Sequence, residues 1–158
     1  MPKTQAKARS ALELLKEDHD KVKEAFKEFE KMDRTDLPTC SELVESVCAD
    51  LTVHAMLEEE IVYPAIREAI GDEDLMNEAA IEHETAKTLI AQLENMEADD
   101  PNYFATFTVL GEYVIHHVEE EEGEMFPQAK KAKGLDLEAL GEQLKARKGE
   151  LTAEMEQA

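Results

Sequence analysis

Apolar residues recur along four stretches of this chain at alternating intervals of three and four residues. This spacing is typical of one face of an α-helix that packs against a core. The first stretch predicts a helix that begins at the capping box Ser10-Ala-Leu-Glu13 and ends near Asp33. Its inward row consists of Leu12, Leu15, His19, Val22, Phe26 and Phe29. One member of the apolar row is therefore a histidine.

Two further rows predict a second and a third helix. The second helix is expected to start at the capping box Thr39-Cys-Ser-Glu42 and to be kinked or loosened at Pro64. Gly71 is expected to end this helix, and Asp72 to cap the third. The third helix should run to about Met96.

The fourth helix is expected to use Asp100 as its N-cap and Pro101 as its first residue, and to end at Gly134. A shorter fifth helix, capped by Asp136, places leucines on one face at positions 137, 140, 144 and 151. These leucines can pack on the bundle or on a partner chain. The pattern predicts an all-α fold with one domain over residues 1–158. Its core is an up-down-up-down four-helix bundle over about 10–133, followed by an extra C-terminal helix over about 136–157.

The chain contains an internal duplication. His83 follows His19 at almost the same interval as His117 follows His54. Asp18-His-Asp20 matches Glu82-His-Glu84, and a His-x3-Glu-Glu sequence followed by an aromatic residue and proline occurs twice. The first two helices and the next two are therefore predicted to form similar hairpins, each with one histidine and one His-x3-Glu pair.

Six polar residues occupy positions in the apolar rows: His19, His54, Glu58, His83, His117 and Glu121. Residues four apart share a helix face, so each His-x3-Glu pair can bind one ion. Lone buried carboxylates are unfavourable, and a cation bound by carboxylate and neutral imidazole removes that penalty. We predict two metal ions, one on His19 and His54 and the other on His83 and His117, with the glutamates as bridges. Imidazole and carboxylate without thiolate favour iron or manganese over structural zinc, and we expect two iron ions.

Other polar residues remain open as further ligands: Glu82, Tyr113, His116 and Glu122. His116 lies one residue outside its row and is the rival of His117. Cys40 and Cys48 are eight residues apart in one predicted helix and are interpreted as structural, which suits a reducing compartment.

Charge narrows the classes of partner. The chain has 38 acidic and 17 basic residues and a formal charge of −21, which opposes binding to nucleic acid or anionic membranes. No apolar run is long enough for a membrane span, and residues 1–10 lack the apolar core of a signal peptide. We therefore expect a cytoplasmic protein, either monomer or homodimer, whose partners are small molecules.

Four segments together resemble the hemerythrin-like family of His-His-Glu cation-binding domains: those that contain His19, His54-x3-Glu58, His83 and His117-x3-Glu121. The resemblance covers about residues 10–130. The resemblance implies a non-haem di-iron centre with an oxo or hydroxo bridge, which binds O2 or related small molecules. The sequence departs from oxygen-carrying hemerythrins at Lys87, where they have a second histidine, and their last carboxylate would correspond to Glu122 instead of Glu121. These departures favour peroxide chemistry or nitric oxide binding over reversible O2 carriage.

Two classes of function follow from the resemblance. The protein is expected to bind or react with O2, peroxide or nitric oxide in oxidative or nitrosative stress defence, with catalase-like peroxide decomposition as the enzymatic form. The alternative is non-enzymatic binding, sensing or storage of O2, nitric oxide or iron. A ferritin-like oxidase fits less well because such sites use Glu-x-x-His spacing, which the inward rows here lack.

Overall fold

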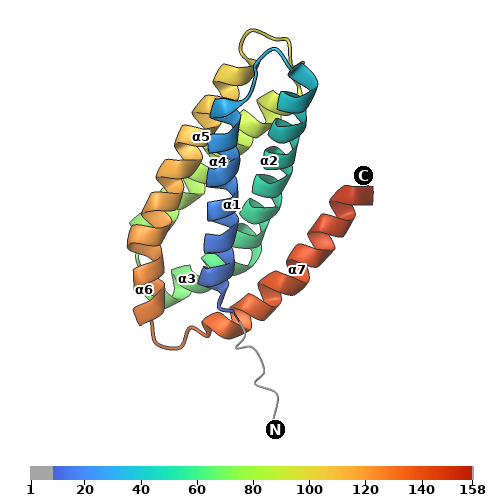
Figure 1. The fold of residues 1–158 in the computed structure, drawn as a ribbon. Helices are drawn as coiled ribbons and strands as arrows, with labels where there is room; N and C mark the ends of the chain where they lie inside the picture. The colour runs from blue at the N-terminus through green and yellow to red at the C-terminus, as the bar shows by residue number, and fades with distance from the viewer. Residues whose placement is uncertain (1–8, 158) are drawn as a thin grey trace.

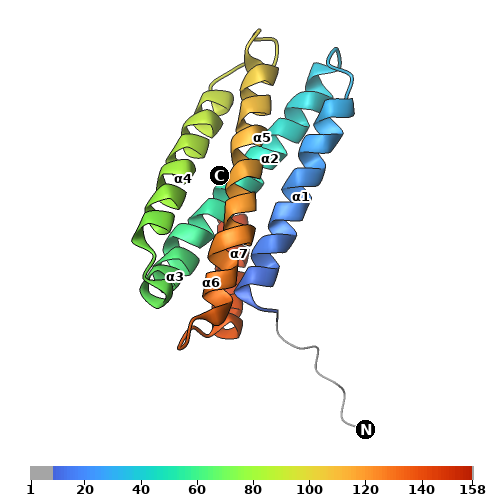
Figure 2. The ribbon, with the colours of Figure 1, turned by 90° about the vertical axis from the view of Figure 1, so that its left-hand side faces the viewer.

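The computed structural model describes residues 9–157, and all regular structure in this range is helical (Figure 1). The α-helices are α1 (Ala11–Lys31), α2 (Leu37–Leu57), α3 (Tyr63–Ile70), α4 (Glu73–Glu94), α5 (Tyr103–Glu120), α6 (Phe126–Lys131) and α7 (Leu137–Gln157). Two π-helical turns, η1 (Glu58–Val62) and η2 (Glu121–Met125), join α2 to α3 and α5 to α6. The long columns alternate in direction, so the predicted all-α bundle with an extra C-terminal helix is confirmed (Figures 1 and 2).

Most of the predicted helix ends are present. The Ser10 hydroxyl accepts a hydrogen bond from the backbone N–H of Glu13. Gly71 ends α3 with a positive φ of 67°, a conformation that glycine adopts without strain. The carboxylate of Asp72 then caps α4, and that of Asp136 accepts from the backbone N–H of Ala139 in the first turn of α7.

The start of α2 differs from the prediction. The helix begins at Leu37 with Asp36 as its N-cap, and Pro38 lies in its first turn. The Asp36 carboxylate accepts from both the backbone N–H and the hydroxyl of Thr39, at 3.4 and 2.7 Å. The expected capping box at Thr39 was wrong because an aspartate is the better acceptor and proline is tolerated in the first turn.

The start of α5 also lies later than predicted. Asp100 and Pro101 form a turn ahead of the helix, which begins at Tyr103. The Asp100 carboxylate accepts from the backbone N–H of Asn102 at 2.8 Å, and its carbonyl accepts from that of Tyr103. Asp100 therefore closes a local turn with the same side chain that was expected to cap the helix.

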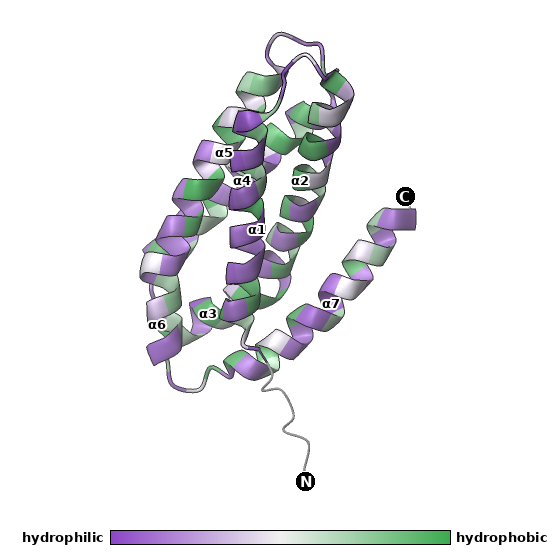
Figure 3. Ribbon diagram, viewed as in Figure 1, coloured by the Kyte–Doolittle hydropathy of each residue, from purple (hydrophilic) through white to green (hydrophobic). Residues whose placement is uncertain are grey.

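The core is divided into two apolar clusters. The cluster near the α1–α2 and α4–α5 connections, called the upper cluster, is dominated by aromatic rings. The ring centroid of Phe107 lies 4.8 Å from that of Phe26 and 4.7 Å from that of Phe29. The lower cluster contains Leu15, Leu57 and their neighbours. Hydrophilic residues cover the outward side of the helices, as the hydropathy colouring of α1 shows (Figure 3). The six polar residues predicted to bind metal lie in sequence between members of the two clusters.

Helix α7 packs on this bundle through its leucines, one of the two arrangements that the sequence left open. Leu140, Leu144 and Leu151 are buried in the lower cluster against α1 and α2. A Cβ atom at Gly141 would lie 2.3 Å from the carbonyl oxygen of Arg9, so the contact with the start of α1 requires glycine. None of the helices within residues 9–157 is long and apolar enough to cross a membrane.

The two cysteines lie unpaired and buried in α2. Cys40 is in contact with the carbonyl oxygen of Asp33 at 3.4 Å. Burial raises the pKa of the Cys48 thiol to about 12, so this thiol is inert at neutral pH. Their environment supports the structural interpretation.

Candidate metal centre

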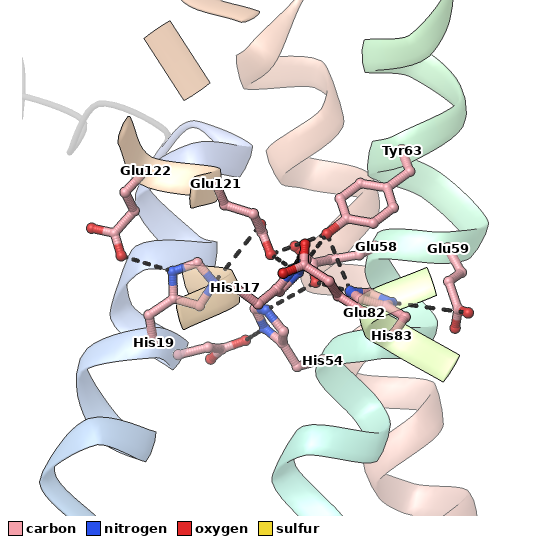
Figure 4. A network of polar contacts seen from close by, with 11 residues as sticks. His19, His54, Glu58, Glu59, Tyr63, Glu82, His83, His117, Glu121 and Glu122 are labelled. Atoms are coloured by element: carbon pink, nitrogen blue, oxygen red, sulfur yellow. Dashed lines mark hydrogen bonds and ion pairs between the residues drawn. The ribbon is translucent and has the colours of Figure 1, made fainter. Parts of the chain in front are cut away.

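The six polar residues of the apolar rows converge between the helices of the bundle (Figure 4). Glu58 is fully buried, Glu121 is 1% exposed, and the histidines lie in the same buried layer. One group of potential ligand atoms comes from Glu58, His83, His117 and Glu121, with all four atoms within 4.8 Å of one another. A second group, from His19, His54 and Glu58, meets the same limit. The structure thus brings together all six residues predicted as metal ligands, in two groups that share Glu58.

Both glutamates stand at the start of a π-helical turn. In η1 the backbone N–H of Tyr63 bonds to the carbonyl of Glu58, and in η2 the backbone N–H of Phe126 bonds to that of Glu121. The prolines that follow each aromatic residue have no N–H to continue the α-helical ladder, which favours a change of hydrogen bonding there. The i-to-i+5 bond places each aromatic residue one turn below its glutamate, on the side that faces the centre.

The inner nitrogens of the histidines face these two carboxylates. The Nε2 atoms of His54 and His83 lie 3.3 and 3.1 Å from Oε1 of Glu58. The Nε2 atom of His117 forms an ion pair with Glu121, and that of His19 lies 4.0 Å from Oε2 of Glu121. The rings of His19 and His54 are 4.9 Å apart, as are those of His83 and His117. These are the same two histidine pairs that the sequence assigned to separate ions.

The outer nitrogens of the histidines face a second set of carboxylates, each from a neighbouring segment. The Nδ1-to-oxygen distances are 3.0 Å for His54 to Asp18, 3.0 Å for His19 to Glu122, 3.2 Å for His117 to Glu82 and 3.9 Å for His83 to Glu59. For His19, His54 and His117 this carboxylate is within hydrogen-bond distance, so it keeps the proton on Nδ1 and leaves the Nε2 lone pair free to bind a metal. Glu59 is too far from His83 to form a hydrogen bond. The arrangement repeats in the two halves, as the sequence duplication predicts.

The four residues that the sequence left open lie around the centre. Glu82 and Glu122 contact histidines as described above, while Glu121 takes the innermost position. Tyr113 is 47% exposed on α5, and the His116 side chain is 64% exposed. His116 is therefore not the inward histidine of α5. Lys87 pairs with Glu59 on the surface, at the position where oxygen carriers have a histidine.

Sequence reasoning missed Tyr63. Its hydroxyl donates to Oε1 of Glu121 at 3.0 Å and lies 3.1 and 3.0 Å from Nε2 of His83 and His117. Burial and the two central carboxylates raise the pKa of Tyr63 well above its usual value, so the hydroxyl keeps its proton. The repeated aromatic-proline pair was the signal for this residue, and its counterpart Phe126 lies near His19 without a hydroxyl.

Helix α7 reaches this centre through two ion pairs. The ammonium of Lys148 lies 2.7 Å from Oδ1 of Asp18, whose other oxygen faces His54. The guanidinium of Arg147 donates to Glu60 in η1 at 2.9 Å. The C-terminal helix thus contacts the π-helical turn and the carboxylate that orients one histidine.

We expect Lys148→Met to weaken metal binding by about tenfold, because Asp18 loses its cation and then holds His54 less firmly. Changing the hydrogen-bond partner of a metal-bound histidine commonly lowers metal affinity by about this factor or more. Chelator competition measures the affinity. Lys145→Met is the matched control, since Lys145 is an exposed lysine of the same helix that forms no ion pair within residues 9–157. Equal affinities in the two variants would show that the contact with Asp18 does not influence the centre.

The protein groups alone leave the centre unsatisfied. Within residues 9–157, five buried polar atoms have no hydrogen-bond partner: His19 Nε2, Glu58 Oε1 and Oε2, His83 Nδ1 and Glu121 Oε2. The Nε2 atoms of His54 and His83 lie 3.3 and 3.1 Å from Glu58, but neither contact is a hydrogen bond. Nitrogen and carboxylate lone pairs that face a common point are the donor set of a transition-metal site. The residues present therefore fit bound cations.

The ionisation of these groups is strongly perturbed. Burial and the Glu58 carboxylate raise the pKa of Glu121 to about 8. Burial alone would lower the pKa of His54, but Glu58 and Asp18 raise it to about 10. Burial lowers the pKa of His19 to about 4. Such displaced values are typical of functional sites.

A cavity of about 270 Å³ adjoins the centre. Its lining includes five residues of the centre: His19, His54, Glu58, His83 and His117. The remainder is largely apolar and is lined by side chains such as Val22, Leu51, Ile90, Val114 and Val118. The centre is therefore accessible to a small molecule from within the bundle.

Comparison with known proteins agrees with this geometry. A family model described as the hemerythrin HHE cation binding domain matches residues 10–129. The chain is 30% identical over 114 residues to a DNA nickase of Nostoc sp. and 24% identical over 112 residues to an uncharacterised hemerythrin-like protein of Schizosaccharomyces pombe. These stretches are 72% and 70% of this chain but 32% and 54% of those proteins, so it spans about a third and about half of their lengths.

A solved structure has the same fold. The crystal structure of a hemerythrin HHE cation binding domain-containing protein from Mycobacterium kansasii matches with a TM-score of 0.76 at 23% identity. The match covers 92% of this chain and 89% of that one. The family match spans both hairpins and all six convergent residues. The chain therefore belongs to the hemerythrin HHE cation-binding domain family and is a metal-binding, hemerythrin-like protein.

Proposed function

We propose that this protein holds two iron ions as a non-haem centre that decomposes hydrogen peroxide. His19 and His54 would bind one ion and His83 and His117 the other, with the carboxylates of Glu58 and Glu121 between them. The observation that carries the proposal is the adjacency of this duplicated ligand set to an apolar cavity that admits small molecules. Bound iron would supply the electron exchange that peroxide disproportionation requires.

The chain's own residues support the reaction in three ways. The apolar walls of the cavity limit the amount of water beside the centre. The carboxylates at Nδ1 orient the imidazoles. The Tyr63 hydroxyl keeps its proton and can turn it from Glu121 toward a small oxygen-containing ligand.

Iron analysis and peroxide turnover test the proposal. Protein from iron-replete medium is expected to carry two irons per chain, to absorb in the near ultraviolet and to evolve oxygen from peroxide. His54→Ala should lose iron and oxygen evolution together. Glu124→Gln, an exposed change in the same π-helical turn as Glu121, should retain both.

Two results would overturn the proposal in different ways. Iron below about one ion per chain would remove the di-iron assignment. Full iron content with a stable, reversible spectral change on adding O2 or nitric oxide, and no oxygen evolution from peroxide, would establish a non-enzymatic binder. Lys87 stands in place of the additional histidine of oxygen carriers, and this favours peroxide decomposition over reversible O2 binding.

We propose that the partners are small molecules and that the protein acts in the cytoplasm. The nickase activity in the name of the Nostoc relative is not carried over, because 38 acidic against 17 basic residues oppose contact with a phosphate backbone. Two free, buried cysteines are compatible with a reducing compartment. A filter-binding assay with duplex DNA at low salt should show no retention, and retention would contradict the proposed partner class.

A further inference from the structure

A second cluster of potential ligand atoms lies outside the centre, between α4 and α5. His116 and Glu120 stand one turn apart on α5, with Nε2 3.0 Å from the carboxylate. Oε2 of Glu82, on α4, is 3.9 Å from the same nitrogen. One ligand atom from each residue falls within 4.8 Å of the others. The His116 side chain is 64% exposed, and those of Glu82 and Glu120 are 20% and 31% exposed, so the cluster is open to solvent.

The cluster copies the inner motif one residue earlier. His116-x3-Glu120 precedes His117-x3-Glu121, and each pair shares one face of α5 because its members are four apart. The shift by one residue turns the outer pair by about a quarter of a turn away from the core. Glu82 joins the two, with one oxygen 3.2 Å from Nδ1 of His117 and the other facing His116.

The duplication supplies an independent indication of a cation at this place. Asp18 is the counterpart of Glu82 in the first hairpin, and its two oxygens face His54 and the Lys148 ammonium. In the described part of the chain, no helix packs on the second hairpin as α7 packs on the first. Within residues 9–157 no lysine or arginine forms an ion pair with Glu82. The outer oxygen of Glu82 meets His116 and Glu120 where the outer oxygen of Asp18 meets a positive charge.

We propose that His116, Glu120 and Glu82 bind one divalent transition-metal ion of the zinc class. Three protein ligands, one imidazole and two carboxylates, with water completing the shell, are a donor set that zinc and its neighbours accept. The ion takes the place that the Lys148 ammonium has in the other half. This outer site is distinct from the inner centre and does not depend on which metal the inner centre holds.

Zinc capacity tests the outer site. Metal-free protein is dialysed against zinc, and bound zinc per chain is measured for the parent and for His116→Ala and Glu120→Gln. Each variant should bind one ion fewer than the parent. The comparison is a difference, so it holds whatever number of ions the inner centre takes, and it separates this proposal from the proposed function.

A matched control and a position check complete the test. Glu119→Gln removes an exposed carboxylate of α5 next to the cluster and should bind as much zinc as the parent. Crystals soaked in zinc should show anomalous scattering beside His116. Equal capacity in all the variants, or the same loss in Glu119→Gln as in Glu120→Gln, would overturn the outer site.

Discussion

Glu121→Gln is expected to lower metal content, because it removes a carboxylate proposed to bridge the two ions, and at the same time to stabilise the metal-free protein. Glu121 is 1% exposed, and its Oε2 has no hydrogen-bond partner. Burial and the nearby Glu58 carboxylate raise its pKa to about 8, so the fold disfavours its charged form. An amide of the same shape removes that charge and can still accept the hydrogen bond from Tyr63. We expect the free energy of unfolding of the metal-free protein at pH 8 to rise by about 1–3 kcal/mol.

Two measurements check this prediction together: metal content by elemental analysis, and urea unfolding after chelation. Glu124→Gln removes an exposed carboxylate from the same π-helical turn and should leave both unchanged. A variant that loses metal and is also less stable without metal would mean that Glu121 supports the fold by itself. We expect metal loss together with a gain in stability of the metal-free protein because functional sites keep groups that the fold alone would not select.

The inward rows made the centre predictable from the sequence. A bundle helix places a residue on its core face every three or four positions, and His19, His54, His83 and His117 occupy such positions. Because spacing alone assigns a residue to the core, the two helix pairs and all six convergent residues could be named without coordinates. The rings of His19 and His54, and those of His83 and His117, lie 4.9 Å apart, so the two histidines of each predicted hairpin are neighbours.

The features that were missed depend on departures from regular helix geometry or on contacts between distant segments. Tyr63 is five residues after Glu58, a spacing that a regular α-helix would turn away from the centre, and the π-helical turn brings it back. The contact of Lys148 with Asp18 joins the last helix to the first. Neither the angle at which α7 crosses the bundle nor its partner helices can be read from a local pattern. The start of α2 was misplaced because two capping signals compete within four residues.

The metal-free and metal-loaded proteins are expected to respond to pH in opposite directions. In the metal-free protein, Glu121 has its pKa raised to about 8, and His54 and His117 have theirs raised to about 10 and 9. Burial opposes the rise for both histidines, and the central carboxylates outweigh it. Groups with raised pKa values bind more protons in the folded than in the unfolded chain. Between about pH 6.5 and 9, folding stability therefore falls as pH rises.

The groups with lowered pKa values act in a different range. Burial lowers the pKa of His19 to about 4. Burial would raise the pKa of Glu58, but His54 holds it well below the usual value. Both groups release their protons on folding, so they make stability rise with pH only up to about pH 6.5, where an unfolded histidine has lost its proton. They do not cancel the alkaline decline of the metal-free protein.

Metal binding reverses the trend because a cation competes with protons for the same imidazoles and carboxylates, and its affinity rises as they lose protons. The difference in melting temperature between loaded and chelator-treated protein should therefore widen steadily from pH 6.5 to 9. Taking the difference removes the contribution of the surface charges, which are the same in both forms. Glu121→Gln should flatten the curve of the chelated form, since one of the three groups with raised pKa values is gone. Parallel curves for the loaded and chelated parent protein would mean that protons and metal do not share these ligands, and the assignment of the centre to the six convergent residues would then fail.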